Sequence, residues 1–193
     1  DDGSGECKLR PAMYSLKEDL ALFLNYPFES ITGIIGFSYG EKGMYPRSQS
    51  DIVSASDAFV LSTKDKFVQD NASFSYPVRF FLMNQTNTIT SYSLKMQYDP
   101  TMFSYEGYTS TGSISESGSI TDASSSGNIE LNYSGSTSAG NNSILVYLNF
   151  SPVSEGSAGL TFNSPTLNGS LIDYATAGNL EYGSDQCGIP KAD

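Results

Sequence analysis

The acidic side chains are the residues of this 193-residue chain that could carry out acid–base chemistry. The sequence contains no histidine, which excludes Ser-His-Asp and Cys-His catalytic sites. Hydrolysis of a glycosidic bond needs only two carboxyl groups, one on each side of the bond. The glutamates that could supply them are Glu106, Glu116, Glu130 and Glu155. Nothing in their spacing selects a pair, so we interpret them as solvated surface acids and predict no catalytic residue.

Metal and cofactor sites also lack a recognisable pattern. Asp99, Asp122 and Asp173 could ligate calcium, but the sequence contains no D-x-[DN]-x-[DN]-G loop. The two cysteines, Cys7 and Cys187, cannot form a zinc site without histidine. No glycine-rich phosphate loop or dinucleotide fingerprint is present. The sequence therefore predicts no metal, no cofactor and no enzymatic activity.

The cysteines and the N-x-S/T sequons for N-glycosylation both indicate the cellular location of the protein. Cys7 and Cys187 favour a disulfide, within the chain or between subunits, and the alternative is two unpaired thiols. Asn132 and Asn149 lie at strand positions whose neighbours point inward, so both should face solvent. These features favour a secreted protein that carries N-glycans, with six candidate acceptors: Asn71, Asn84, Asn132, Asn141, Asn149 and Asn168.

The charge of the chain excludes two classes of partner. Ten basic and 21 acidic residues give a net charge of -11, whereas a nucleic-acid backbone or an anionic membrane surface requires a basic face. We interpret the acidity mainly as a solubility feature. No run of 18 apolar residues occurs, so we predict no membrane span.

The segment that organises the rest of the chain extends from Phe74 to Tyr108. Large apolar residues fall on its even positions before residue 83, at Phe74, Tyr76, Val78, Phe80 and Leu82. The alternation returns with Tyr92, Leu94, Met96 and Tyr98 set against Ser91, Ser93, Lys95 and Gln97. A period of two predicts strands with one buried and one solvated face. The Asp99-Pro100 step that follows predicts a tight turn.

Further short strand patterns fill the chain from Ala58 onward. They cover 58–63, 102–109, the surroundings of Ile120, 127–134, 143–151, 159–162 and the surroundings of Leu167 and Leu180. Ser- and Gly-rich stretches at 110–127 and 135–142 read as loops. The prediction is a mostly β fold: an antiparallel jelly-roll β-sandwich of about nine strands over residues 58–193.

Residues 1–57 form an N-terminal arm with a different pattern. Ser15 and Glu18 make a capping box for a short helix at about 15–25, which Pro27 ends, although ALFLNYPF could also form a strand. An apolar strand is predicted at 31–39, where one face carries Ile31, Ile35, Phe37 and Tyr39 and Gly33 leaves a gap. Residues 40–57 are polar, with Gly and Pro, and predict a linker.

The arm allows two interpretations. It could fold back onto the edge of its own domain, or it could donate the 31–39 strand to the open sheet edge of a neighbouring subunit. In the second case Ile31, Ile35, Phe37 and Tyr39 make the subunit contact, and Gly33 allows close backbone approach. Head-to-tail contacts of this kind build an open homopolymer, a filament or a surface layer.

The order of the strand sequences resembles the cohesin domain. The segments that carry the resemblance are VRFFL, ITSYSLKMQYDPTMFSYEGYTSTGS, GNIELNYS, ILVYLNF and AGLTF, and they span about residues 58–183. The YDP step with its flanking strands is the most specific of them. The 57-residue extension, the sequons and the terminal cysteines depart from the ordinary cohesin pattern.

This resemblance implies a nine-stranded jelly roll of the group shared with carbohydrate-binding modules. It also implies a non-catalytic module that binds a dockerin through one sheet face, or that serves as a structural part of a cell-surface protein. Sugar platforms are rows of exposed aromatic rings, and among the 13 tyrosines we expect Tyr105 and Tyr108 to be the exposed pair. Two functions are therefore predicted: a self-assembling extracellular subunit, and a binding module for a protein or carbohydrate partner.

Overall fold

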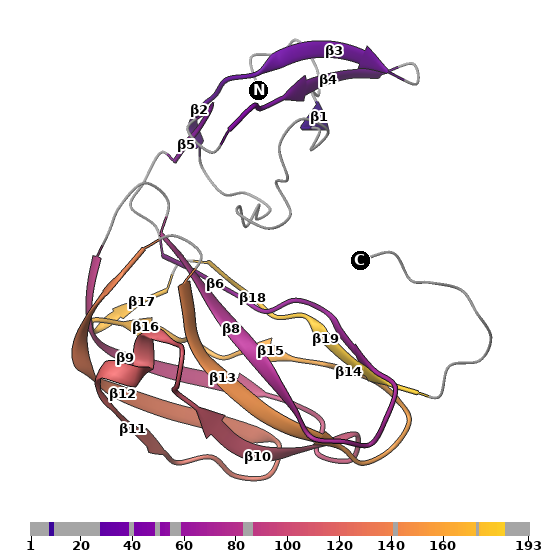
Figure 1. Ribbon diagram of the computed structural model, residues 1–193, viewed down its shortest axis with the longest axis vertical. Coiled ribbons are helices and arrows are strands. Elements are labelled where there is room, and N and C mark those ends of the chain that lie inside the picture. The colour runs from indigo at the N-terminus through magenta and orange to yellow at the C-terminus, as the bar shows by residue number, and fades with distance from the viewer. Residues whose placement is uncertain are drawn as a thin grey trace.

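The structure, a computed structural model, describes residues 8–9, 28–38, 41–48, 51–54, 59–82, 87–140, 143–172 and 174–183. Within these ranges the protein consists of β-strands and loops, and the helical residues belong to short 3-10 turns such as η2 (Ile114–Ser117). Two large sheets pack face to face (Figure 1). The predicted mostly β sandwich is confirmed.

One sheet, called the β8 sheet below, has the order β10 (Phe103–Thr109), β13 (Ser143–Pro152), β8 (Phe74–Leu82), β6 (Phe59–Ser62) and β18 (Tyr174–Thr176). The second, the β9 sheet, has the order β11 (Ser119–Asp122), β12 (Asn128–Ala139), β9 (Asn87–Gln97), β16 (Thr166–Leu167) and β17 (Ser170–Leu171). In addition, β15 (Thr161–Phe162) pairs with β9. A smaller sheet joins β14 (Gly156–Gly159), β19 (Asn179–Tyr182) and β7 (Lys66–Val68).

The rows of apolar residues seen in the sequence meet between the two sheets. Tyr76, Val78 and Phe80 of β8 are buried, as are Tyr92, Leu94 and Met96 of β9. The Phe150 ring lies at the centre of an aromatic cluster and contacts the rings of Phe74, Tyr76, Tyr98 and Tyr105. Burying aromatic side chains contributes a large share of core stability, so the alternation in the sequence is the direct cause of this fold.

A buried polar contact connects the sheets through η2. Ser115, only 1% exposed, donates its hydroxyl hydrogen to the Leu145 carbonyl at 2.6 Å. The Tyr92 hydroxyl lies 2.7 Å from Ser115 Oγ and therefore donates to it. The Tyr92 ring also stacks on Tyr133 at a centroid distance of 5.0 Å. Burial raises the pKa of Tyr92, so the phenol stays neutral and the interior polar groups stay paired.

The sandwich departs from the prediction in three places. β12 continues to Ala139 through residues 135–139, where a loop was expected, because a bulge after Ser134 lets Thr137 pair with Ile89. β6 and β7 pair with β18 and β19 in parallel, whereas only antiparallel pairs were expected. Short strands β7, β17 and β18 had no clear sequence pattern, since two or three residues are too few to show a period.

The described part of the arm forms pairings of its own. β4 (Glu41–Tyr45) lies between β1 (Lys8–Leu9) and β3 (Ile34–Ser38), and β2 (Phe28–Ile31) pairs with β5 (Ile52–Ser54). The expected strand over 31–39 is thus divided at Thr32-Gly33, and β4 and β5 occupy part of the expected linker 40–57. The expected helix at 15–25 and residue Tyr39 lie outside the described residues.

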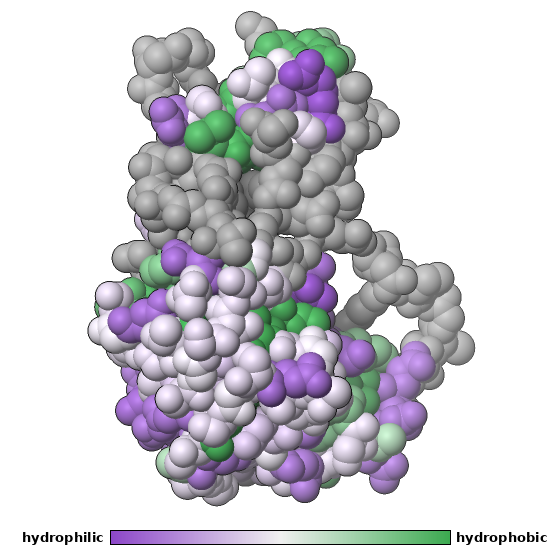
Figure 2. Space-filling model, turned by 60° about the vertical axis from the view of Figure 1, so that its left-hand side comes forward, coloured by the Kyte–Doolittle hydropathy of each residue, from purple (hydrophilic) through white to green (hydrophobic). Residues whose placement is uncertain are grey.

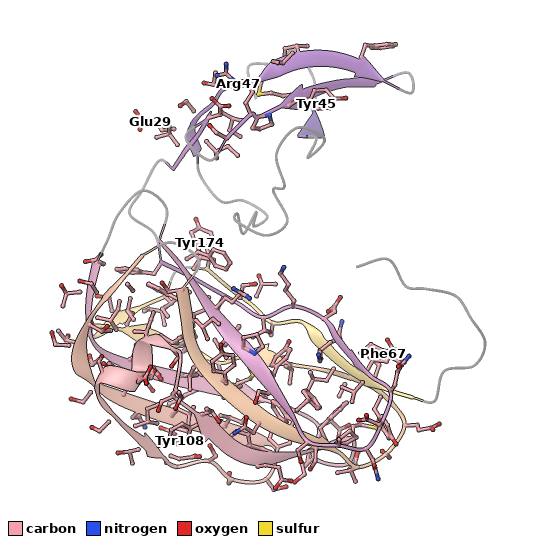
Figure 3. All side chains as sticks on the ribbon, in the orientation of Figure 1. Glu29, Tyr45, Arg47, Phe67, Tyr108 and Tyr174 are labelled. Atoms are coloured by element: carbon pink, nitrogen blue, oxygen red, sulfur yellow. The ribbon has the colours of Figure 1, made fainter. Side chains whose placement is uncertain are left out.

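Close packing explains the break at Gly33. A Cβ atom there would lie 2.8 Å from the Tyr45 carbonyl oxygen and 2.9 Å from Met44 Cγ. A Cβ at Gly36 would lie 2.7 Å from the Tyr45 ring. The close approach that Gly33 was expected to allow to a neighbouring subunit is therefore made to the chain's own β4. Figure 3 labels Tyr45 on this hairpin.

Candidate binding face

The outer surface of the β8 sheet is closed where β6 pairs with β8. Val60 and Phe81 are partners in the antiparallel register, next to the core pair Leu61 and Phe80. The alternation points Val60 and Phe81 away from the core, yet they are only 1% and 4% exposed. This part of the outer surface is therefore unavailable to a protein partner.

The outer surface of the β9 sheet is open and polar. The inward residues Ile129, Leu131 and Tyr133 are buried, so the alternating residues point outward. We define the β9 face as the outward residues of β9 and β12: Ser91, Ser93, Lys95 and Gln97 with Asn128, Glu130, Asn132 and Ser134. These residues are exposed or half-buried. Figure 2 shows that hydrophilic and neutral surface covers most of the visible sandwich.

The strand register extends the β9 face sideways. Asn132 pairs with Ser93 on β9 and with Thr121 on β11, and Ser93 pairs with Thr166 on β16. One row of short polar side chains thus crosses the sheet from β11 to β16. Hydroxyl and amide groups both donate and accept hydrogen bonds, which suits recognition of a polar protein surface.

The charges of the β9 face are paired. Lys95 Nζ lies 3.2 Å from Glu130 Oε1, and the two side chains are 46% and 38% exposed. A surface ion pair of this kind contributes little to stability, but its two charges remain accessible to a partner. The face therefore combines a neutral net charge with two groups that can set the orientation of a bound protein.

The expected exposed pair, Tyr105 and Tyr108, is a wrong prediction. Both side chains are half-buried, and they connect the edges of the two sheets. The Tyr105 hydroxyl donates to Asp122 Oδ2 at 3.1 Å, and the Tyr108 hydroxyl donates to the Ile120 carbonyl at 3.3 Å. A bulge between Tyr105 and Gly107 turns both rings to the same side of β10, which simple alternation does not anticipate.

An open cleft of about 630 Å³ lies beside this contact. Its lining includes Tyr98, Pro100 and Tyr105 together with Asp122 and Ser124–Ser126. Burial, and then the charge of Asp122, raises the pKa of Tyr105. The Tyr105 phenol therefore stays protonated as a hydrogen-bond donor and is unsuited to act as a base.

The candidate catalytic and calcium-binding acids are dispersed over the sandwich. Glu106 accepts a hydrogen bond from Ser151 Oγ at 2.7 Å, which lowers its pKa, and Glu116 accepts one from the Gly112 amide at 3.0 Å. Glu130 pairs with Lys95, and Glu155 is exposed.

Each calcium candidate that the structure describes has protein partners. Asp99 accepts hydrogen bonds from Thr101, and Asp122 accepts them from Tyr105 and the Ser124 amide. Asp173 lies outside the described residues. Within the ranges that the structure covers, no three His, Cys, Asp or Glu side chains group as metal ligands do.

Comparison with known proteins identifies the family. The family model for the cohesin domain matches residues 58–179. The chain belongs to the cohesin family. Among curated proteins no relative matches.

Solved cohesin structures share this fold. A non-cellulosomal cohesin from the archaeon Archaeoglobus fulgidus is 16% identical with a TM-score of 0.53, covering 66% of this chain and 92% of its own. The sixth cohesin of Acetivibrio cellulolyticus scaffoldin B, solved with a Cel5 dockerin, is 17% identical with a TM-score of 0.51, covering 65% and 99%. A cohesin module from a Clostridium perfringens family 33 glycoside hydrolase is 15% identical with a TM-score of 0.53, covering 66% and 97%.

The sequence did not single out the β9 face of this cohesin as a site. Its residues appeared only as the polar half of the strand alternation. That polar half was the available signal: rows of Ser, Asn and Gln, with Lys95 and Glu130 among them, on two strands that pair in the same sheet.

Among the described residues, no helix is long and apolar enough to cross a membrane.

The sequons of this cohesin occupy different environments. Asn71 and Asn132 are exposed, whereas Asn149 is half-buried. Asn168 is exposed as a residue, but its side-chain amide is bonded to β9. Asn84 and Asn141 lie outside the described residues, as do Cys7 and Cys187.

The predicted subunit-contact residues are in part exposed on the hairpin. Ile35 and Phe37 share one face of β3 and are 60% and 72% exposed, and Ile34 on the other face is 49% exposed. Ile31 is half-buried in β2. Figure 2 shows apolar surface at the end of the molecule that carries the hairpin.

Proposed function

We propose that this cohesin is a non-catalytic recognition module that binds a dockerin-type protein partner on its β9 face. The observation that supports the proposal is the difference between the two outer surfaces. The β9 face is open, polar and continuous across β11, β12, β9 and β16, while the β8 sheet is closed at Val60 and Phe81. Other cohesins of this fold have been solved in complex with dockerins, which supports the proposal. We further propose that the protein is extracellular, on the basis of its sequons and two cysteines.

Arginine substitutions on the β9 face and on the smaller sheet that contains β14 test the proposal. Ser93→Arg puts a long charged side chain at the middle of the β9 face, and Ser157→Arg puts the same side chain on exposed β14 as a matched control. Binding would be measured by calorimetry against a panel of dockerins that includes the Cel5 dockerin.

We expect at least one dockerin to bind, Ser93→Arg to weaken its binding at least about tenfold, and Ser157→Arg to leave it unchanged. A panel in which no dockerin binds the parent chain contradicts the proposal. So does equal weakening by the two variants.

A second candidate function is self-assembly through the arm. The specific observation in its favour is that β3 is an edge strand of its sheet within the described residues and exposes Ile35 and Phe37. An apolar edge strand with free N–H and C=O groups is a template for strand addition by another chain. A copy of the same chain could add there and continue into a filament or surface layer.

The oligomeric state tests this second candidate. Phe37→Asp should reduce concentration-dependent association in light scattering, while Val153→Asp, on a 58% exposed residue of the sandwich, should not. A parent chain that stays monomeric up to high concentration rules out assembly through the arm.

A further inference from the structure

Hydrogen bonds divide the sequons into two groups. Asn168 Oδ1 accepts from the backbone amides of Thr90 and Ser91 at 2.8 and 3.2 Å, and its Nδ2 donates to the Thr88 carbonyl at 2.9 Å. The Asn149 amide accepts from Ser75 Oγ at 2.8 Å and donates to Thr109 Oγ1 at 3.0 Å. A sugar on either Nδ2 would have to fit beside the group to which that nitrogen donates.

Asn71 and Asn132 belong to the other group. Both are exposed, and in the part of the chain that the structure describes no hydrogen bond holds either side-chain amide. Asn71 follows β7 in the turn that leads to β8. Asn132 lies within β12, between the buried residues Leu131 and Tyr133, so its side chain is directed outward. Each has a free Nδ2 atom on the surface.

The position of Asn132 on the β9 face means that a glycan attached to it would also affect partner binding. It pairs with Ser93 on one side and Thr121 on the other, and the next outward pair along β12 and β9 is Glu130 with Lys95. Asn132 therefore lies at the centre of the β9 face, next to its only described ion pair. A solvated oligosaccharide attached there would stand over the surface that a protein partner needs.

We propose that Asn132 is an N-glycan acceptor and that its glycan closes the β9 face to protein partners. In the reaction Asn132 Nδ2 forms a bond to the anomeric carbon of a lipid-linked oligosaccharide diphosphate. The bond from that carbon to the diphosphate oxygen breaks, lipid diphosphate leaves, and the amide loses one proton. The acceptor role stands independently, whereas the control of partner binding rests on the proposed function.

Site occupancy is the first test. The full chain would be secreted from a host that attaches N-glycans, and glycopeptides would be mapped by mass spectrometry. Asn71 and Asn132 should be occupied, and Asn149 and Asn168 should be bare. Ser134→Ala destroys the Asn132 sequon while keeping the asparagine, and should remove that glycan alone. An unmodified Asn132 in the parent chain overturns the proposal.

Shielding of the face is the second test and needs no partner. A small N-hydroxysuccinimide ester acylates accessible lysines, and Lys95 lies on the β9 face while Lys66 on β7 serves as an internal control. The glycan should cause a loss of Lys95 acylation, with Lys66 unaffected, and Ser134→Ala should restore it. Equal acylation of Lys95 in the two proteins shows that the glycan does not cover the face.

Dockerin binding separates the two proposals. If Ser134→Ala binds a dockerin at least about tenfold more tightly than the glycosylated parent, both proposals are supported. If both proteins bind equally, the glycan does not control the face, although the face binds. If Lys95 is shielded but neither Ser134→Ala nor the parent chain made in a host without N-glycosylation binds a dockerin, the modification stands and the proposed function fails.

Discussion

The Tyr105 hydroxyl donates a hydrogen bond to Asp122 Oδ2 at 3.1 Å, and this contact joins the edge strands of two different sheets. Tyr105 belongs to β10 in the β8 sheet, and Asp122 belongs to β11 in the β9 sheet. Tyr108, labelled in Figure 3, makes a second contact between the same two strands, because its hydroxyl donates to the Ile120 carbonyl. The two tyrosines thus close one side of the sandwich.

Removal of the Tyr105 hydroxyl tests this closure. Tyr105→Phe keeps the ring against Phe150 but leaves Asp122 without this donor, so we expect a loss of about 0.5–1.5 kcal/mol in the free energy of unfolding. Urea denaturation measures it. Tyr147→Phe, on the outward side of β13, is the matched control and should change stability by less than about 0.5 kcal/mol. Equal effects would show that the Tyr105–Asp122 contact has no special role.

The bulge that orients these tyrosines depends on Gly107. Its φ of +103° is strained for any residue with a Cβ, while the space around that Cβ is open. Gly107→Ala should therefore destabilise by about 1–3 kcal/mol through backbone strain alone. Gly159→Ala has no positive φ and should cost less. If thermal unfolding shows that Gly107→Ala is as stable as the parent chain, the bulge accommodates alanine without strain.

Asn168 holds the turn between β16 and β17 to β9. Its φ is +48°, and its side chain bonds to Thr88, Thr90 and Ser91. Asn168→Gly removes these hydrogen bonds, but glycine adopts the positive φ without strain. We therefore expect a loss of about 1–3 kcal/mol in the free energy of unfolding. Asn168→Ala should cost about 1–2 kcal/mol more, because alanine resists positive φ. Chemical denaturation of both variants separates the effect of the hydrogen bonds from that of the positive φ. If both variants lose the same free energy of unfolding, the positive φ has no measurable cost for alanine.

Alkaline stability depends on the buried tyrosines. Burial raises the pKa of Tyr76 from 10.0 to about 12, and its hydroxyl donates to the Lys64 carbonyl at 2.6 Å. A pKa raised in the folded state gives stability that is complete below pH 10 and is lost as the pH rises to about 12. Tyr76→Phe should be less stable at neutral pH but lose less between these values. Urea denaturation of the parent chain and of Tyr76→Phe between pH 10 and about pH 12 measures this difference. If the two free energies of unfolding fall in parallel with pH, the prediction is wrong.

Acid should loosen the arm at Asp51. Hydrogen bonds from Arg47 lower the pKa of Asp51 from 3.8 to about 2. A lowered pKa gives stability that is present above pH 3.8 and is lost as the pH falls through about 2. Asp51→Asn should remove this dependence, measured by amide hydrogen exchange in β2 and β5. Asp70→Asn, in the sandwich, should leave that exchange unchanged.

Several parts of the fold followed from the sequence because their cause is local. Rows of large residues at alternate positions in 74–82 and 91–98 require two covered sheets. The structure buries Tyr76, Val78 and Phe80 of the first row and Tyr92, Leu94 and Met96 of the second. The Asp99-Pro100 turn followed from side-chain chemistry, with Thr101 bonded to Asp99. The arm was less predictable, since whether 31–39 pairs at all depends on residues 41–45, which carry no strand alternation.

The sequence by itself determined that this chain is a β-sandwich of the cohesin type, because alternation and turn residues act over a few neighbours. Only the tertiary structure decided which outer surface is open, since Val60 and Phe81 look like any other strand residues until their register is known. It also decided that Tyr105 and Tyr108 are half-buried between the edges of the two sheets and that Asn132 lies at the centre of the β9 face. Bulges and strand order set these positions, and both depend on contacts between residues far apart in the chain.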